Sequence, residues 1–247
     1  IGACDWSSDV CSSDLPAPVQ GLYPWPFDGR WSPADTALIV IDMQIDFCAP
    51  GGWLDARGVD LAPLRKPIDP LRRLLAAMRA GGFPILHTRE GHRPDLSDLP
   101  ENKRWRSAQD GGEIGAKGPL GRYLVRGEAC HDIIPELYPE PGETVIDKPG
   151  KGAFWATDLD LILERRGVRN LVVTGVTTDC CVQSTLRDAN DRGYECLLLE
   201  DCCAAAKEEN HRAQVEMLKL VGGHYGSIAT SDAFLAALTA NAEPEHA

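Results

Sequence analysis

The residues best suited to chemistry in this sequence are two adjacent cysteines, Cys180 and Cys181. They follow a short apolar run at residues 171–173, which is typical of a strand buried on both faces. Gly175 interrupts that run, and helix-starting side chains at residues 177–179 lead into an amphipathic helical pattern. This order places a thiol at a helix N-terminus, where free N–H groups stabilise a thiolate and an oxyanion. The segment therefore predicts a catalytic thiol, with a small buried apolar side chain as the alternative.

Two further segments end predicted strands with a charged group. Residues 38–47, LIVIDMQIDF, form a buried strand that ends at Asp42, and residues 143–152, ETVIDKPGKG, contain a short strand that ends at Lys148. Because the carboxyl ends of parallel strands share one edge of a sheet, we expect both groups to meet the thiol there. Asp42 is the best candidate for a base, since burial raises the pKa of a carboxyl group. Lys148 would pair with Asp42 and lower the thiol pKa from its usual value of about 8.5, and the alternative is a structural ion pair.

Together, these three motifs resemble the signature of the isochorismatase-like cysteine hydrolases. The family pattern D-x-Q-x-D-F falls on DMQIDF at residues 42–47, and the central lysine falls on Lys148. The pattern G-x-x-T-x-x-C falls on GVTTDCC at residues 175–181. The resemblance runs from about Thr36 to Leu238 and thus covers nearly all of the expected fold.

The resemblance implies a catalytic triad and a covalent route. The triad would be Asp42, Lys148 and Cys181, with Cys180 in a variable position. The oxyanion hole would consist of the N–H groups of Thr177 and Cys181, with a non-proline cis peptide bond just before Thr177. A thioester, or a thiocarbamate from a urea-type substrate, would form on the thiol. Water would then release it, with Asp42 again acting as the base.

One branch of the family looks closest to residues 87–107, 146–154 and 190–203, namely the biuret hydrolases and their triuret-hydrolysing relatives. These enzymes cleave C–N bonds in small linear ureides, which are flat, polar and rich in carbonyl groups. Lys151 is the candidate carbonyl donor that this branch carries. Further candidate residues of the substrate pocket are Phe47, Arg89 and Trp105.

Val221 departs from that branch, where a glutamine amide is expected to hold the distal end of biuret. Valine leaves that end free and adds room, so we expect triuret slightly ahead of biuret as the substrate. The alternatives are a ureidoacrylate-type or nicotinamide-like amidase, an isochorismatase that needs no cysteine, and a non-catalytic isochorismatase-like interaction domain. The presence of Cys181 argues against an isochorismatase proper, and Asp42, Lys148 and Cys181 together argue against a non-catalytic domain.

No metal or other cofactor is expected. Nicotinamidases of this family carry an Asp-His-His cluster, whereas His87 and His92 lie five residues apart here with no matching Asp-x-His upstream. Each histidine is therefore expected to be a satisfied structural residue. The resemblance further implies a small-molecule ureide as the partner and a homotetramer as the assembly.

Composition restricts the class of protein further. With 247 residues, 43% of them hydrophobic and 25% charged, the chain is expected to form one medium domain. The net charge of −12 argues against nucleic acid or an anionic membrane as the partner. No apolar run approaches the roughly 20 residues of a membrane span, and no signal peptide is recognisable, so a cytoplasmic protein is expected. The nine cysteines fit neither a disulfide framework nor a zinc site, and free thiols are expected.

The alternation of apolar strands and amphipathic helices predicts an α/β three-layer sandwich, with about six mostly parallel strands and helices on both faces. Strands are expected at residues 36–42, 83–88, 144–147, 171–173, 195–199 and 227–230. The main helices are expected at residues 67–80, 158–166, 208–220 and 232–240, besides the helix that follows the cysteines.

Three parts are expected along the chain. Residues 1–33 would form an N-terminal arm on the domain or on a neighbouring subunit, and the first 15 of them look unlike native coding sequence. Residues 34–240 would form the isochorismatase-like domain, and residues 241–247 a tail. Within the domain, residues 89–126 are rich in glycine and charge. They would form either a lid over the site or a solvated excursion.

Overall fold

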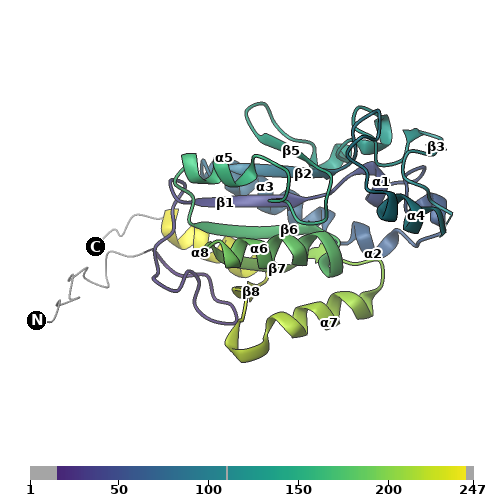
Figure 1. Ribbon diagram of the computed structural model, residues 1–247. Helices are drawn as coiled ribbons and strands as arrows, with labels where there is room; N and C mark the ends of the chain where they lie inside the picture. The colour runs from purple at the N-terminus through teal and green to yellow at the C-terminus, as the bar shows by residue number, and fades with distance from the viewer. Residues whose placement is uncertain (1–15, 110, 243–247) are drawn as a thin grey trace, which may run out of the picture.

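The computed structural model describes residues 16–109 and 111–242, which fold around a six-stranded sheet (Figure 1). The strand order is β5-β2-β1-β6-β7-β8, and every pairing within this sheet is parallel. The strands are β1 (Thr36–Ile41), β2 (Ile85–Glu90), β5 (Thr144–Lys148), β6 (Asn170–Val176), β7 (Glu195–Ala204) and β8 (Ser227–Ala229). A separate antiparallel pair joins β3 (Lys117–Gly118) and β4 (Gly121–Arg122). The expected α/β fold is confirmed.

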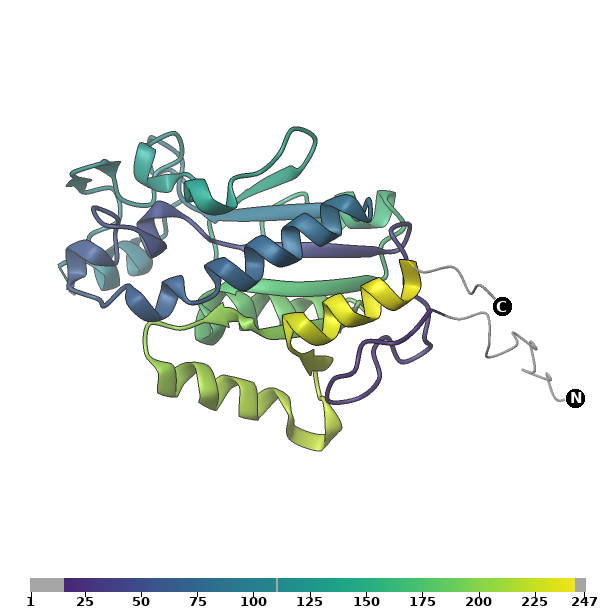
Figure 2. The same cartoon turned by 180° about the vertical axis from the view of Figure 1, so that it is seen from behind.

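Helices cover both faces of the sheet, as expected. The helices are α1 (Ile45–Cys48), α2 (Ala62–Arg65), α3 (Ile68–Ala80), α4 (Glu101–Gln109), α5 (Leu159–Arg165), α6 (Gln183–Asp191), α7 (Glu208–Leu218) and α8 (Ser231–Ala242). Helices α5 and α6 lie in front of the sheet in Figure 1, whereas α3 and α8 cover the opposite face in Figure 2. Both ends of α3, α5, α7 and α8 lie within two residues of the ends expected from the sequence.

Alternate residues of the central strands form two separate cores. Leu38 and Val40 of β1 belong to the core beneath α3 and α8, whereas Ile39 and Ile41 belong to the core beneath α5 and α6. Every residue of β1 and of its neighbour β6 is buried. Successive side chains of a strand point to opposite faces, so a strand covered on both faces reads as a continuous apolar run. This explains why both strands are recognisable in the sequence.

Gly175 brings β6 against β1 at the edge of the sheet that carries the site. Its Cα is in register with that of Ile41, and a Cβ atom on Gly175 would collide with the backbone oxygen of Ile41. Gly175 also has a φ of 108°, which L side chains rarely adopt. Because glycine satisfies both demands, the turn after β6 can approach Asp42, the residue that follows β1.

The segment before β1 is part of the packed domain rather than a surface arm. Trp25 is fully buried and Trp31 is 5% exposed. The Trp31 ring lies 5.9 Å from the Phe83 ring and 5.3 Å from the Phe234 ring, measured between centroids. The boundary expected at residue 34 therefore cuts through one core, because these tryptophans fill the space between α3 and α8.

Some expectations concern residues that lie outside the described part of the chain. These are the non-native character of residues 1–15, most of the tail at residues 241–247, and two of the nine cysteines, Cys4 and Cys11. The other seven cysteines are free thiols, as expected. Among the described residues, no helix is long and apolar enough to cross a bilayer.

Candidate active site

The carboxyl ends of four adjacent strands supply the polar centre of the molecule. In the order β5, β2, β1 and β6, these ends carry Lys148, Glu90, Asp42 and the turn with Cys181. The Lys148 Nζ lies 2.8 Å from the Asp42 Oδ2, and both side chains are inaccessible to solvent. The carboxylates of Asp42 and Glu90 and the sulfur of Cys181 all lie within 4.8 Å of one another. The structure therefore brings together the three residues expected to form the triad, and adds Glu90.

Asp42 is held by contacts on both of its carboxylate oxygens. The Thr88 hydroxyl donates a hydrogen bond of 2.6 Å to Oδ1, while Lys148 approaches Oδ2. Lys148 also donates to the backbone carbonyls of Gly150 and Lys151, at 3.0 and 2.9 Å. Burial would lower the pKa of Lys148, but Asp42 and, more weakly, Cys181 and Glu90 raise it. Lys148 is therefore a permanent cation that fixes Asp42 and the loop after β5.

Cys181 lies in a π-helical turn, Thr178–Val182, that precedes α6. The expectation of a lowered thiol pKa is wrong here. The contact with Cys180, burial, and the carboxylates of Asp42 and Glu90 raise the pKa of Cys181, although Lys148 opposes them. The thiol donates a hydrogen bond of 3.4 Å to the Glu90 Oε2. A thiol in this environment needs a base to become a nucleophile.

Cys180 has a different environment. It is half-buried at the cavity wall, and its contact with Cys181 lowers its pKa to about 7, with a further contribution from Lys151. Of the two cysteines, it is Cys181 whose sulfur lies within 4.8 Å of the carboxylates of Asp42 and Glu90. A lower pKa thus favours Cys180 as the nucleophile, whereas a carboxylate within reach favours Cys181. We assign the nucleophile by geometry, because proton transfer needs a base within reach.

Glu90 is the residue that the sequence analysis missed. Its side chain is fully buried and accepts hydrogen bonds from Lys103 at 2.7 Å and from Lys151 at 2.9 and 3.1 Å. Burial would raise the pKa of Glu90, but the ammonium groups of Lys151, Lys148 and Lys103 lower it. Glu90 is thus an anion that links α4, the loop after β5 and the nucleophile.

The D-x-Q-x-D-F motif builds the frame around the site. The Gln44 side chain accepts from the backbone N–H of Glu90 at 2.7 Å and donates to the carbonyls of Glu90 and His131. Asp46 accepts from the backbone N–H groups of Trp53 and Leu124, and burial raises the pKa of Asp46 to about 6. Gln44 and Asp46 therefore hold backbone segments in place rather than bind substrate. Asp46 fixes the segment that carries Trp53.

The nucleophile opens into a cavity of about 260 Å³. Its walls combine the apolar side chains of Phe47, Trp53 and Leu54 with Glu90, Lys151 and the turn after β6. The peptide bond between Val176 and Thr177 is cis, as the family resemblance implied. Thr177 and Cys181, the two expected oxyanion-hole residues, both line this cavity, as do Phe47 and Lys151.

Three expected pocket residues lie elsewhere. Arg89 points to the opposite face of β2 from Glu90 and binds Asp147 and Asp132 at 2.8 and 2.9 Å. Trp105 is 63% exposed on α4 and does not line the cavity.

Val221 is 88% exposed in a short turn after α7. Helix α7 carries the chain away from the active-site edge and back toward the start of β8 (Figure 1). The assignment of Val221 to the pocket is therefore wrong for this chain, and the argument that preferred triuret to biuret fails with it.

The polar centre does not suit a metal ion, although Asp42, Glu90 and Cys181 have the spacing of a ligand set. The Lys148 ammonium pairs with the Asp42 Oδ2, and the ammonium groups of Lys103 and Lys151 pair with the Glu90 carboxylate. A divalent cation would have to displace ammonium groups that already neutralise these carboxylates. His87 and His92 are engaged elsewhere, with Glu143 at 2.9 Å and Asp98 at 3.3 Å.

The fold and the buried group of aspartate, lysine and cysteine define a hydrolase of the isochorismatase family. Residues 36–230 match the isochorismatase domain, and the chain belongs to this family. It is 31% identical over 243 residues to the ureidoacrylate amidohydrolase RutB of Pseudomonas savastanoi pv. phaseolicola, covering 96% of this chain and 98% of that protein. It is 34% identical over 208 residues to the RutB of Methylobacterium radiotolerans, covering 82% and 80%.

Solved structures agree with this assignment. A cysteine hydrolase from Pseudomonas syringae pv. phaseolicola superimposes with a TM-score of 0.72 at 25% identity, covering 86% of this chain and 97% of that one. The N-carbamoylsarcosine amidase from Thermoplasma acidophilum superimposes with a TM-score of 0.61 at 28% identity, covering 80% and 97%.

Proposed function

We propose that this protein is a cysteine-dependent amidohydrolase that cleaves a C–N bond of a small linear N-carbamoyl compound. The observation that carries this proposal is the buried arrangement of Asp42, Lys148 and Cys181, in which Cys181 lines a cavity. A structural ion pair would not require a thiol and two carboxylates to converge within 4.8 Å. Perturbed ionisable groups that converge in a cavity are typical of catalytic sites.

In the proposed reaction, Asp42 takes the proton of Cys181 as the sulfur attacks the carbonyl carbon. The carbonyl oxygen becomes an oxyanion that the N–H groups of Thr177 and Cys181 stabilise. The C–N bond then breaks, and the proton held by Asp42 passes to the leaving nitrogen. The product left on the enzyme is a thioester, or a thiocarbamate when the attacked carbon carries a second nitrogen.

Hydrolysis of this intermediate reuses the same groups. Asp42 removes a proton from water, which attacks the carbonyl carbon. The C–S bond then breaks, and the proton on Asp42 returns to the sulfur, which regenerates the thiol. Lys148 holds Asp42 in place through both half-reactions. Lys151 supplies a donor at the cavity wall for a second substrate oxygen, and Glu90 fixes the position of that donor.

The choice of substrate now rests on the relatives rather than on Val221. Two of the similar proteins are named as a ureidoacrylate amidohydrolase and an N-carbamoylsarcosine amidase, and both names describe compounds with a carbamoyl group. We therefore place ureidoacrylate-type compounds first. Biuret and triuret, the substrates expected from the sequence, come second. Both are also carbamoyl compounds, and the homotetramer stays a prediction.

The test is ammonia release by the purified protein from 3-ureidoacrylate, N-carbamoylsarcosine, biuret, triuret and nicotinamide, with the Cys181→Ser variant as the control. We expect release from at least one carbamoyl compound, little from nicotinamide, and none by the variant. Ammonia release that survives in Cys181→Ser would remove the thiol mechanism. No release from any compound would favour the second candidate, a non-catalytic interaction domain.

A further inference from the structure

A second cavity of about 370 Å³ adjoins the catalytic cavity and shares Trp53 and Lys151 with it. We call it the vestibule and define it by its basic and aromatic lining residues, which are Arg57, Lys103, Arg106, Lys151, Trp53 and Trp155. Because Trp53 and Lys151 line both cavities, the two spaces lie side by side at the active-site edge. The vestibule is therefore the natural place for the end of the substrate that does not react.

The charge of the vestibule is opposite to that of the chain. Four basic side chains line it, and its described lining residues include no aspartate or glutamate. The whole chain has a net charge of −12. A local excess of one charge in a protein of the other sign concentrates oppositely charged ligands. The vestibule is thus suited to an anion.

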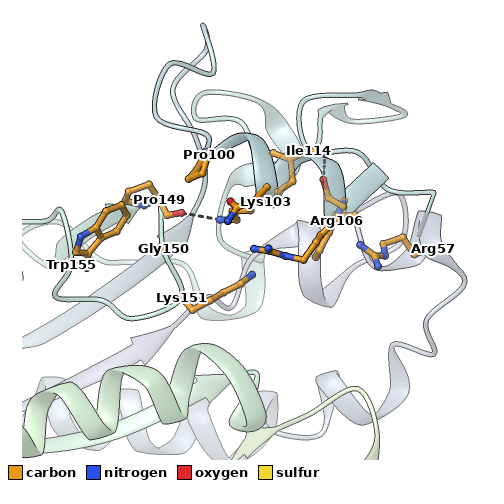
Figure 3. A pocket seen from close by; sticks show the side chains of 12 residues that line it. Arg57, Pro100, Lys103, Arg106, Ile114, Pro149, Gly150, Lys151 and Trp155 are labelled. Carbon is orange, nitrogen blue, oxygen red and sulfur yellow. Dashed lines mark hydrogen bonds between the residues drawn. The ribbon is translucent and has the colours of Figure 1, made fainter. Parts of the chain in front are cut away.

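Three of the vestibule cations, Lys103, Lys151 and Arg106, share few anionic partners among the described residues. Lys103 and Lys151 share one carboxylate, that of Glu90. On the same helix, Arg104 pairs with Glu113 at 2.6 Å, whereas Arg106 has no ion-pair partner within the described part of the chain. Figure 3 shows the Arg106 side chain reaching from α4 toward the ends of Lys103 and Lys151. Three cationic groups therefore converge around a single internal anion.

We propose that Arg106, together with Lys151, binds the carboxylate of a linear ureido acid whose carbamoyl group lies at Cys181. This inference rests on the proposed function and narrows its substrate class. A guanidinium group binds a planar carboxylate through two parallel N–H donors, and an ammonium adds a point charge. Biuret and triuret carry no anionic group and would leave this set of cations unused.

The spacing sets the length of the ligand. The path from the nucleophile runs 3.4 Å from the Cys181 Sγ to the Glu90 Oε2, and the same oxygen lies 3.1 Å from the Lys151 Nζ. The Lys151 Nζ therefore lies no farther from the sulfur than these two contacts together, so a short spacer suffices between the attacked carbonyl and a carboxylate at Lys151. A ureido group and a two-carbon spacer, as in 3-ureidopropionate or 3-ureidoacrylate, fit this spacing.

The test compares a charged ligand with a neutral one of the same length. The Cys181→Ser protein would be titrated calorimetrically with 3-ureidopropionate and with N-propylurea, which replaces the carboxylate by a methyl group. We expect 3-ureidopropionate to bind at least tenfold more tightly, and its affinity to fall with added salt. Adding Arg106→Gln should weaken binding of 3-ureidopropionate at least tenfold and leave N-propylurea within twofold.

The matched control is Arg104→Gln, on the same helix but outside the lining of the vestibule, which should change neither affinity. Equal affinities for the two ligands would overturn the proposal. So would an Arg106→Gln variant that weakens both ligands alike, because that pattern indicates a structural role. Inorganic phosphate that binds as tightly as 3-ureidopropionate would also overturn it, since the ureido group would then contribute nothing.

Failure of this proposal is distinguishable from failure of the proposed function. Suppose that neutral ureides are hydrolysed and that Arg106→Gln does not change the affinity for 3-ureidopropionate relative to N-propylurea. The amidohydrolase activity would then be supported, and the carboxylate site would be refuted. If 3-ureidopropionate binds through Arg106 but the wild-type protein releases ammonia from no carbamoyl compound, the anion site stands and the proposed reaction falls.

Discussion

The sulfur of Cys181 lies 3.4 Å from the carboxylate oxygen Oε2 of Glu90, and its thiol donates to that oxygen. The proposed nucleophile therefore rests against an anion as well as near the Lys148 ammonium. A neighbouring negative charge disfavours the thiolate and so contributes to the raised pKa of Cys181. Substrate binding and deprotonation would thus be linked events in this cavity.

Replacing Glu90 by glutamine should lower the pKa of Cys181, because it removes a negative charge and leaves two lysine ammonium groups nearby. The measurement is the pH dependence of iodoacetamide alkylation in a Cys180→Ser background, so that only one thiol of the pair reacts. Turnover should fall by about 10- to 100-fold, since Lys151 loses the partner that positions it. Glu113→Gln, which breaks a surface pair with Arg104, is the control and should change neither quantity. An alkylation profile unchanged by Glu90→Gln would show that Glu90 does not influence the thiol.

Mutation should distinguish the roles of the two neighbouring cysteines in catalysis. Cys181→Ser should abolish ammonia release while the fold persists, because the serine hydroxyl is a much weaker nucleophile in this position. Cys180→Ser should retain most activity, since Cys180 lies outside the group formed with Asp42 and Glu90. Steady-state ammonia release and circular dichroism of both variants test this. The opposite ranking of the two variants would move the nucleophile to Cys180.

Lys148→Arg should reduce turnover by more than about 100-fold. The Lys148 ammonium is enclosed by Asp42 and two backbone carbonyls, and the side chain has no exposed surface. A guanidinium group is planar and larger, so it cannot keep this compact arrangement. The exposed Lys66, which pairs with Glu208, offers Lys66→Arg as a control with unchanged activity. If kcat for Lys148→Arg stayed within a few-fold of wild type, Lys148 would have no role in the triad.

Stability should decrease in mild acid partly because of His131. Burial lowers the pKa of His131 from 6.5 to about 4. Below pH 6.5 the unfolded chain therefore binds a proton that the folded chain refuses, and stability is lost as the pH falls toward 4. The loss from this residue is about 2 kcal/mol at pH 5. Urea unfolding at pH 8 and pH 5 measures it.

In the same experiment, His131→Gln should lose less stability between pH 8 and pH 5 than the wild type. The exposed His224 provides the control, and His224→Gln should show the wild-type pH dependence. Identical pH dependence of wild type and His131→Gln would contradict the assignment.

How far the sequence predicts the structure depends on whether the determinants are local. Strands β1 and β6 are recognisable because both of their faces are buried, so that their apolar runs are continuous. The sequence predicts that the strand at residues 83–88 ends at Thr88. In the structure it continues to Glu90, whose Cα is in register with that of Lys148. The neutralising lysines come from distant segments, so no local pattern indicates a buried glutamate here.

The same limit explains the errors at the site. The raised pKa of Cys181 reflects the contact with Cys180, burial and two carboxylates from other strands, whereas the sequence suggested only the helix end and Lys148. Successive side chains of β2 point to opposite faces, so Arg89 lies on the other face from Glu90. The sequence could not predict this, because it did not show that the strand extends to these residues. Val221 was placed by analogy with a motif, but the direction of α7 decides its position.

The buried aromatic cluster before β1 has a spectroscopic consequence. Trp25 and Trp31 are enclosed in the core, whereas Trp53 and Trp155 line the vestibule at the active-site edge of the sheet. Indole emission shifts to longer wavelength when the ring becomes hydrated. Unfolding must therefore shift the emission of the first pair to the red, while a ligand that enters the vestibule perturbs the emission of the second pair. Intrinsic fluorescence thus offers separate optical reporters for global unfolding and for occupation of the site, without any attached dye.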